Sequence, residues 1–288
     1  MKKQQTSAIF LAVLAAALYA ISTPFSKLLL SHVPPTMMAS LLYLGAGIGM
    51  ALLSLFKIRK GTLRKEMNLT KKELPYIIGM ILLDILAPIF LMIGLFSTTP
   101  ETVSLLNNFE IVATSVIALV LFKEVIPSRL WLAIVLITLA SILLSVEDFG
   151  MLTFSKGSLL VLLASICWGF ENNITRALSV KDPMQVVILK GFGSGFGSLI
   201  IAWYLGEVTR NTVYILFALL LGFVAYGLSI YLYVYAQRYL GAAKTSAYYA
   251  IAPFIGAILS LLIFRQMPAS TFLLALSIMI IGTYIAST

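Results

Sequence analysis

Four ionisable side chains stand inside long apolar stretches of this chain: Asp84, Glu110, Glu171 and Lys190. An ionised group within the hydrocarbon of a membrane costs at least a few kcal/mol unless it is paired or hydrated. Each of the four therefore needs a partner, a proton or watery surroundings. The chemistry that they offer is ion pairing, proton uptake and electrostatic binding of a small charged molecule.

Glu171 and Lys190 are predicted to form an ion pair. Glu171 lies eight residues before the end of the helix expected at 157–179, and Lys190 lies six residues after the start of the helix at 184–206. At about 1.5 Å per residue, both sit roughly 9–12 Å into the membrane from the same side. Two interpretations stay open: a buried pair that fixes helix register, and a gate on the cytoplasmic side that responds to substrate.

A polar face is expected on the helix at 101–122. Ser104, Asn107, Glu110 and Thr114 follow helical i, i+3, i+4 spacing in an otherwise apolar segment. Because a lipid-facing polar stripe is unfavourable, we expect this face to line a cavity. The alternative is an interhelical hydrogen-bond network.

Asp84 lies near the middle of the helix expected at 74–97, one turn before Pro88. A proline bends a helix and frees a backbone carbonyl, which suits a helix that lines a cavity. The alternative for Asp84 is a hydrogen-bonded structural carboxyl.

Aromatic side chains accompany the acids, and an acid beside aromatic rings suits an ammonium group through charge and cation–π attraction. The alternative for each ring alone is packing or interfacial anchoring. The candidate substrate-binding or cavity residues are Tyr19, Ser22, Asp84, Asn107, Glu110, Trp168, Glu171, Asn172, Tyr226, Tyr233 and Tyr249.

The composition identifies the solvent of these elements as lipid. Of 288 residues, 60% are hydrophobic and 11% are charged, and the mean hydropathy is +1.02. A soluble domain carries roughly a quarter charged residues. The net charge of +9 does not predict nucleic-acid binding, because the basic residues form no basic helix face.

Several chemistries are excluded or disfavoured. Cys167 and His32 are the only residues of their types, which excludes an internal disulfide and removes most zinc and Ser-His chemistry. No Walker A motif is present. We therefore expect no metal, no cofactor and no enzymatic activity.

Ten apolar windows are long enough to cross about 30 Å of hydrocarbon as helices. They are residues 7–30, 36–56, 74–97, 101–122, 130–146, 157–179, 184–206, 213–237, 242–264 and 270–287. The first is too long for a secretory signal and is kept as a span. The predicted fold class is an all-α integral membrane protein with ten transmembrane helices.

The basic residues sort to one side of these spans. Fifteen fall on the side of the termini and four on the other, which predicts a multi-pass protein of the cell membrane with both termini cytoplasmic. The long polar linker 57–73 holds seven of the fifteen and is expected to lie near anionic headgroups.

The chain repeats itself, which predicts two five-helix units, residues 1–150 and 151–288. Since five is odd, the second unit enters the membrane from the opposite side, and the two are related as inverted repeats. An offset of 149 aligns Leu14-Ala15 with Leu163-Ala164, Ser26-Lys27 with Thr175-Arg176, Pro34 with Pro183, and Gly45 and Gly49 with Ser194 and Ser198; after the linker, an offset of 142 aligns Ser104 with Ser246 and Phe122-Lys123-Glu124 with Phe264-Arg265-Gln266.

The layout resembles the EamA-type permeases of the drug/metabolite transporter superfamily. The resemblance rests on the five-plus-five helices, Trp168-Gly169 in the sixth helix and the stretch from Leu105 to Glu110 in the fourth. It covers essentially the whole chain. The resemblance implies export or facilitated transport of amino acids and related metabolites.

The expected function is a secondary carrier or facilitator for small polar metabolites such as amino acids or amines, working by alternating access. Open alternatives are an uptake carrier for a quaternary amine, a membrane enzyme and a non-transporting membrane subunit. The expected partners are a small-molecule substrate and the bilayer. Proton coupling through carboxylates such as Glu110 or Glu171 stays open beside uncoupled facilitation, and the oligomeric state is open.

Overall fold

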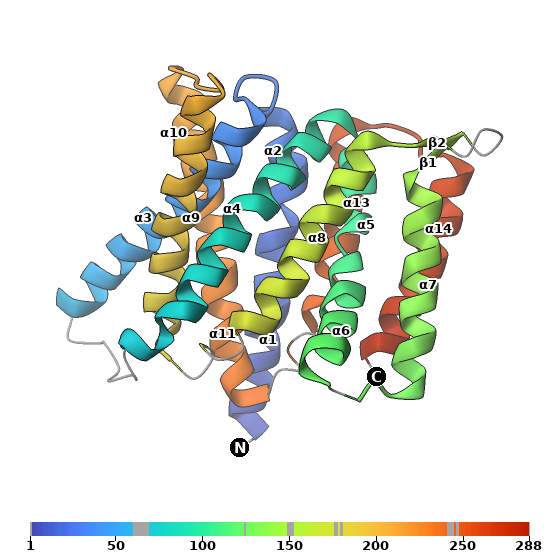
Figure 1. Ribbon diagram of the computed structural model, residues 1–288, viewed down its shortest axis with the longest axis horizontal. Helices are drawn as coiled ribbons and strands as arrows, with labels where there is room; N and C mark the ends of the chain where they lie inside the picture. The colour runs from blue at the N-terminus through green and yellow to red at the C-terminus, as the bar shows by residue number, and fades with distance from the viewer. Residues whose placement is uncertain are drawn as a thin grey trace.

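The computed structural model describes residues 2–59, 69–123, 125–148, 153–175, 178, 181–240, 245 and 248–287. Its ribbon is a bundle of helices with a small hairpin at one end (Figure 1). The elements are α1 (Lys2–Ala20), α2 (Ser22–Leu29), α3 (Pro35–Arg59), η1 (Lys71–Glu73), α4 (Leu74–Ser97), α5 (Pro100–Leu106), α6 (Phe109–Phe122), α7 (Ser128–Ser145), β1 (Val146–Asp148), β2 (Thr153–Phe154), α8 (Lys156–Thr175), α9 (Pro183–Tyr204), α10 (Thr212–Gly222), the π-helical η3 (Phe223–Leu228), α11 (Ser229–Leu240), α13 (Ala252–Phe264) and α14 (Ser270–Ser287).

Nine helices within the described residues are long and apolar enough to cross a bilayer. Each matches a predicted window to within a few residues, so the multi-pass helical fold is confirmed. The tenth window, 242–264, is described in part, and its second half is the apolar helix α13. Residues 60–68 of the predicted linker and the end of the sixth window beyond Thr175, Leu178 apart, lie outside the described residues.

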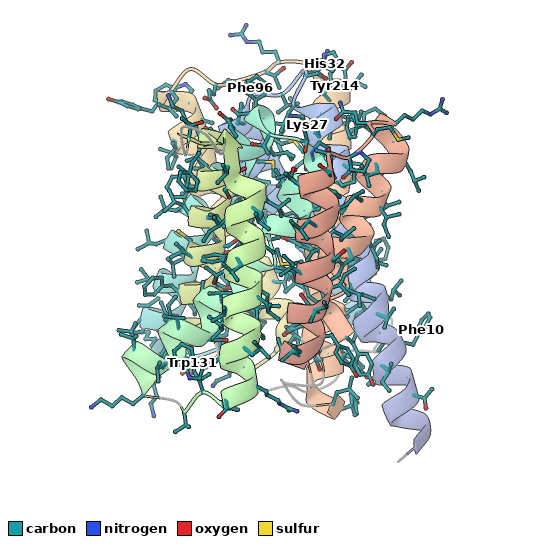
Figure 2. The ribbon with its side chains drawn as sticks, turned by 90° about the vertical axis from the view of Figure 1, so that its right-hand side faces the viewer. Phe10, Lys27, His32, Phe96, Trp131 and Tyr214 are labelled. Atoms are coloured by element: carbon teal, nitrogen blue, oxygen red, sulfur yellow. The ribbon has the colours of Figure 1, made fainter. Side chains whose placement is uncertain are left out.

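The outer surface is apolar, as a lipid-facing surface must be. Phe10 is 65% exposed and Trp203 is 75% exposed. Exposed aromatic residues lie near both ends of the bundle: Figure 2 shows Trp131 and Phe10 towards one end and Phe96 towards the other. Aromatic residues at both ends are typical of the two membrane–water interfaces. The first and last helices, α1 and α14, have their free ends at the same end of the bundle (Figure 1).

Three predicted spans are interrupted, which the sequence analysis did not anticipate. Turns stand at Ile21, at Asn107–Asn108 and at Ala250–Ile251. At Asn107–Asn108 the backbone stays right-handed but tightens, because Glu110 N donates to Asn107 O (3.1 Å) and Ile111 N donates to Asn108 O (3.0 Å). Asparagine is a poor helix former, so two in sequence favour such a break. Tight i→i+3 turns inside a helix often mark functional positions.

A short two-stranded antiparallel hairpin, which the sequence analysis did not anticipate, joins α7 to α8 in an otherwise helical fold. Val146 pairs with Phe154 and Asp148 with Thr153. The connection is short, and the adjacent ends of α7 and α8 bring its two arms side by side, where their backbone groups pair. The hairpin lies at the edge of the bundle (Figure 1).

Close helix contacts at glycine hold the centre together. α3 packs most extensively against α9, and α4 against α8. Gly191 of α9 lies directly against the backbone of Gly47 in α3, so that a Cβ on Gly191 would overlap it. Small residues let transmembrane helices approach at backbone distance, where dispersion contacts replace the missing hydrophobic driving force. This contact brings Tyr43 and Lys190 to the same level.

Candidate functional site

Lys190 bridges two carboxylates in the middle of the bundle. Its Nζ lies 3.1 Å from Glu171 Oε1 and 3.0 Å from Asp84 Oδ2. The Glu171–Lys190 contact is the one that matching depths in adjacent helices predicted. All three residues are buried, with Asp84 fully inaccessible. Three helices, α4, α8 and α9, therefore share one charge cluster.

The sequence analysis missed Asp84 as the second partner of Lys190. A signal was present: Asp84 lies ten residues into α4, or about 15 Å along the helix, close to the depth expected for the other two. Which way its side chain points depends on the rotation of α4, which the sequence does not reveal. Asp84 also accepts a hydrogen bond of 2.9 Å from Tyr43 Oη. The alternative of a hydrogen-bonded carboxyl is thus realised in this conformation.

Glu110 accepts a hydrogen bond from the sixth span. Asn172 Nδ2 donates to Glu110 Oε1 at 2.6 Å and lies 3.3 Å from Thr114 Oγ1. Asn173 Nδ2 extends the contact by donating to the carbonyl of Thr114 at 3.1 Å. Glu110 also interacts electrostatically with Glu171 and Lys190. The interhelical network left open for this helix is therefore present, and it joins α6 to α8.

The predicted continuous polar face from Ser104 to Thr114 is wrong. The tightened turn at Asn107–Asn108 changes the helical phase, because an i→i+3 turn holds fewer residues than an α-helical one. Ser104 lies beside Gly256 of α13, whereas Glu110 and Thr114 face α8. Asn107, at the turn, is 8% exposed, and its Oδ1 has no hydrogen-bond partner among the described residues.

Tyrosine rings from four spans form a continuous aromatic wall beside the charges. The ring centroids of Tyr43 and Tyr226 are 5.2 Å apart, those of Tyr226 and Tyr19 5.7 Å, and those of Tyr19 and Tyr249 5.9 Å. Tyr233 meets Tyr249 edge-on at 5.0 Å. Four of these five rings are among the predicted site residues, and Tyr43 is the one that the sequence analysis missed.

Tyr226 stands in the π-helical segment η3, where a π-bulge re-aims side chains. Its ring is 2% exposed. The hydroxyl of Ser22, in the first turn of α2, lies close to the hydroxyl of Tyr226. Within the described part of the chain neither hydroxyl completes a hydrogen bond of ordinary geometry. Two buried hydroxyl groups therefore face the aromatic wall with capacity to bind a ligand.

Trp168 belongs to the same buried cluster as two of the tyrosines. It is 7% exposed and shares the main apolar core with Tyr43 and Tyr226. Its neighbour Gly169 lies against Ala113 and Thr114, so the helix bearing Trp168 closely approaches α6. In this conformation the indole is part of the packed core.

A second lysine, which the sequence analysis counted only as a loop charge, fixes the end of a span. Lys27 Nζ donates to the carbonyls of Leu95 (2.6 Å), Phe96 (3.0 Å) and Thr98 (2.8 Å). Figure 2 shows Lys27 and Phe96 at the same end of the bundle. The last carbonyls of a helix lack intrahelical donors, so a cation there stabilises the end of α4.

Acidic side chains outnumber basic ones in this cluster. Asp84, Glu110 and Glu171 accompany Lys190, and Tyr43 lies against Asp84. With its carboxylates ionised, such an arrangement would attract a cationic group by charge and by ring quadrupoles. Among the described residues no group of three His, Cys, Asp or Glu could hold a metal ion.

Two comparisons with known proteins indicate a transporter, and a third concerns the fold. The sequence model of the EamA-like transporter family matches residues 6–146 and 155–288. An "Uncharacterized transporter" of Methanothermobacter thermautotrophicus is 29% identical over 273 residues, covering 88% of this chain and 78% of that protein. A solved structure titled "Crystal structure of protein" has a TM-score of 0.69 at 17% identity, covering 98% of this chain and 96% of that one. The last comparison concerns the fold alone.

Proposed function

Since the chain belongs to the EamA-like transporter family, a family of membrane transporters, we propose that it carries small ammonium-bearing metabolites, amino acids or amines, by alternating access. The observation that supports this substrate class is the buried cluster of three carboxylates and one lysine beside the tyrosine wall. An ammonium group entering that cluster meets net negative charge and aromatic faces together. A carrier rather than an open pore fits a site that is buried in this conformation.

The proposed carrier consists of two inverted five-helix repeats. In support, the interruption at Asn107–Asn108 recurs about 142 residues later, at Ala250–Ile251, where the ninth span turns. Lys123 and Arg265, again 142 residues apart, both end their helices in the left-handed conformation, with φ of 54° and 51°. This left-handed conformation is uncommon for residues other than glycine. The same offset relates Asp84 to Tyr226, so the two halves contribute a carboxylate and a phenol at matching places.

Pairing between the halves also supports the inverted arrangement. α3 packs against α9, α5 against α13 and α7 against α14, and each of these pairs joins a span to its repeat partner. The two-fold relation between the repeats also converts the contact of α4 with α8 into the contact of α11 with α1, and both contacts are present. In transporters of this type the substrate site lies at the interface of the repeats, near the midplane.

Transport in proteoliposomes tests the substrate class. We expect uptake of at least one compound from a panel of amino acids, amines and neutral metabolites. Glu110→Gln and Glu171→Gln should each slow it at least about tenfold, because losing a charged partner costs about 1.4 kcal/mol or more. Glu147→Gln, which alters an exposed carboxylate in the hairpin, serves as the control. Full activity in both site variants would show that neither carboxylate takes part in binding the substrate.

The same vesicles separate two coupling modes. If transport is proton-coupled, an imposed pH step drives accumulation of the substrate against its gradient. A facilitator equilibrates the substrate and goes no further.

We also propose that both termini are cytoplasmic, on the strength of the basic residues that gather at that end. Cysteine labelling in intact cells tests this orientation, in a Cys167→Ser background. An impermeant maleimide should label Ser31→Cys and leave Lys72→Cys unlabelled, since the two residues are exposed in connections at opposite ends. Labelling of Lys72→Cys alone would reverse the assignment.

A further inference from the structure

Lys190 lies between two carboxylates, where a bound cationic ligand would lie, rather than beside one acidic partner. Its ammonium group lies between Asp84 and Glu171, at 3.0 and 3.1 Å. We propose that these two carboxylates form an ammonium-binding site, and that Lys190 is its built-in occupant whenever the carrier is empty. The inference rests on the proposed function and extends it: the substrate's ammonium takes the place that Lys190 vacates.

The geometry provides a site for one cation between the two carboxylates. Asp84 is held from its other side by Tyr43 at 2.9 Å and is fully buried. The groups that face the lysine are Asp84 from α4, Glu171 from α8, Glu110 from α6 and Tyr226 from η3. None of these groups from the described residues is basic.

Lys190 has the longest and most flexible side chain of the cluster. Its ammonium stands at the end of four methylene groups, while both carboxylates sit on shorter side chains. The lysine side chain retains 11% exposure, compared with 0% for Asp84. A substrate cation can therefore displace the lysine without moving the helices that carry the acids.

The occupant matters most in the step that returns the empty carrier. During alternating access the site passes through a closed state of low dielectric, in which bare carboxylates are strongly unfavourable. When substrate is bound, its ammonium neutralises the pair. When the carrier is empty, Lys190 must do so, because the described residues offer no other basic side chain at that position.

Because substrate neutralises the carboxylates in the loaded carrier and Lys190 does so in the empty carrier, two kinds of flux should depend differently on Lys190. Exchange of substrate for substrate uses the loaded carrier in both directions and does not need Lys190. Net efflux into substrate-free medium requires the empty carrier to return. A lysine that only fixed helix packing would affect both fluxes alike, because both use the same folded protein.

The experiment compares the two fluxes for Lys190→Ala in proteoliposomes, with whichever panel substrate the wild type carries. We expect net efflux to fall at least about tenfold, while exchange stays within about threefold of wild type. Ethylammonium, small enough to fill the space of the deleted side chain, should restore part of the net efflux and raise the melting temperature of Lys190→Ala. It should leave the melting temperature of the wild type unchanged.

Lys181→Ala is the matched control, since Lys181 pairs with Glu73 at 3.1 Å outside the cluster and should change neither flux. If Lys190→Ala does not fold, Lys190→Met, which removes the charge but fills much of the space of the lysine stem, takes its place with the same expected split between the two fluxes. Parallel loss of exchange and net efflux in a folded variant overturns the inference and leaves the proposed function standing. A wild-type protein that carries no panel compound overturns the proposed function and the inference with it.

Discussion

Gly191→Leu is expected to prevent the helices from assembling around the charge cluster. The glycine lies against Gly47 N and Cα and close to the carbonyl of Tyr43, so any side chain must push α3 away from α9. Backbone atoms cannot yield as a flexible side chain can. Overpacking of this kind destabilises a fold by about 3 kcal/mol or more. Separation of the two helices would also draw Tyr43 away from Asp84.

The measurement is the melting temperature and the fraction of monodisperse protein in detergent. A graded comparison isolates the cause: Gly191→Ala should be clearly destabilised, whereas Gly79→Ala should be tolerated. An added Cβ on Gly79 meets only Ile174 at an ordinary 3.4 Å. Equal melting temperatures for the two alanine variants would show that α3 and α9 are not packed as closely as described.

Asp84→Asn is expected to abolish most transport while leaving the protein folded. The amide keeps the shape of the carboxyl and can still accept the hydrogen bond from Tyr43. Lys190 retains Glu171 as its partner at 3.1 Å. What disappears is one buried negative charge from the site that we propose for the substrate's ammonium. Losing a desolvated charged partner costs about 3 kcal/mol, which corresponds to about a hundredfold lower transport rate.

Initial transport rate and melting temperature, measured on the same preparation, check this prediction. Glu73→Gln is the matched control, because it removes a carboxylate that pairs with a lysine, Lys181, away from the cluster. Its transport should equal that of the wild type. Wild-type transport by folded Asp84→Asn would mean that the substrate does not use this carboxylate.

The sequence predicted the spans and one contact of the site correctly, because both depend on position along a single helix. Helix ends follow the hydrophobic length that lipid demands. Glu171 and Lys190 were paired from their depths alone, and the structure places them 3.1 Å apart. The acids themselves were recognisable as site candidates because ionised groups are costly inside a membrane.

Other parts of the site depended on how the helices rotate and how closely they approach. The pairing of Glu110 with Asn172 required the altered phase after Asn107–Asn108. Tyr43 belongs to the cluster only because glycines let α3 approach α9 at backbone distance. Trp168 lies in one buried cluster with Tyr43 and Tyr226, a grouping that also depends on how the helices rotate.

The apolar segments long enough to cross a membrane were therefore recognisable in the sequence alone, because hydrophobic length and helical rise are local properties. Tertiary packing, in contrast, brings Asp84 and Glu171 together around Lys190 and places five tyrosines in one wall. Those contacts join residues far apart in the chain. They follow from helix rotation and backbone approach, which packing of the whole bundle sets.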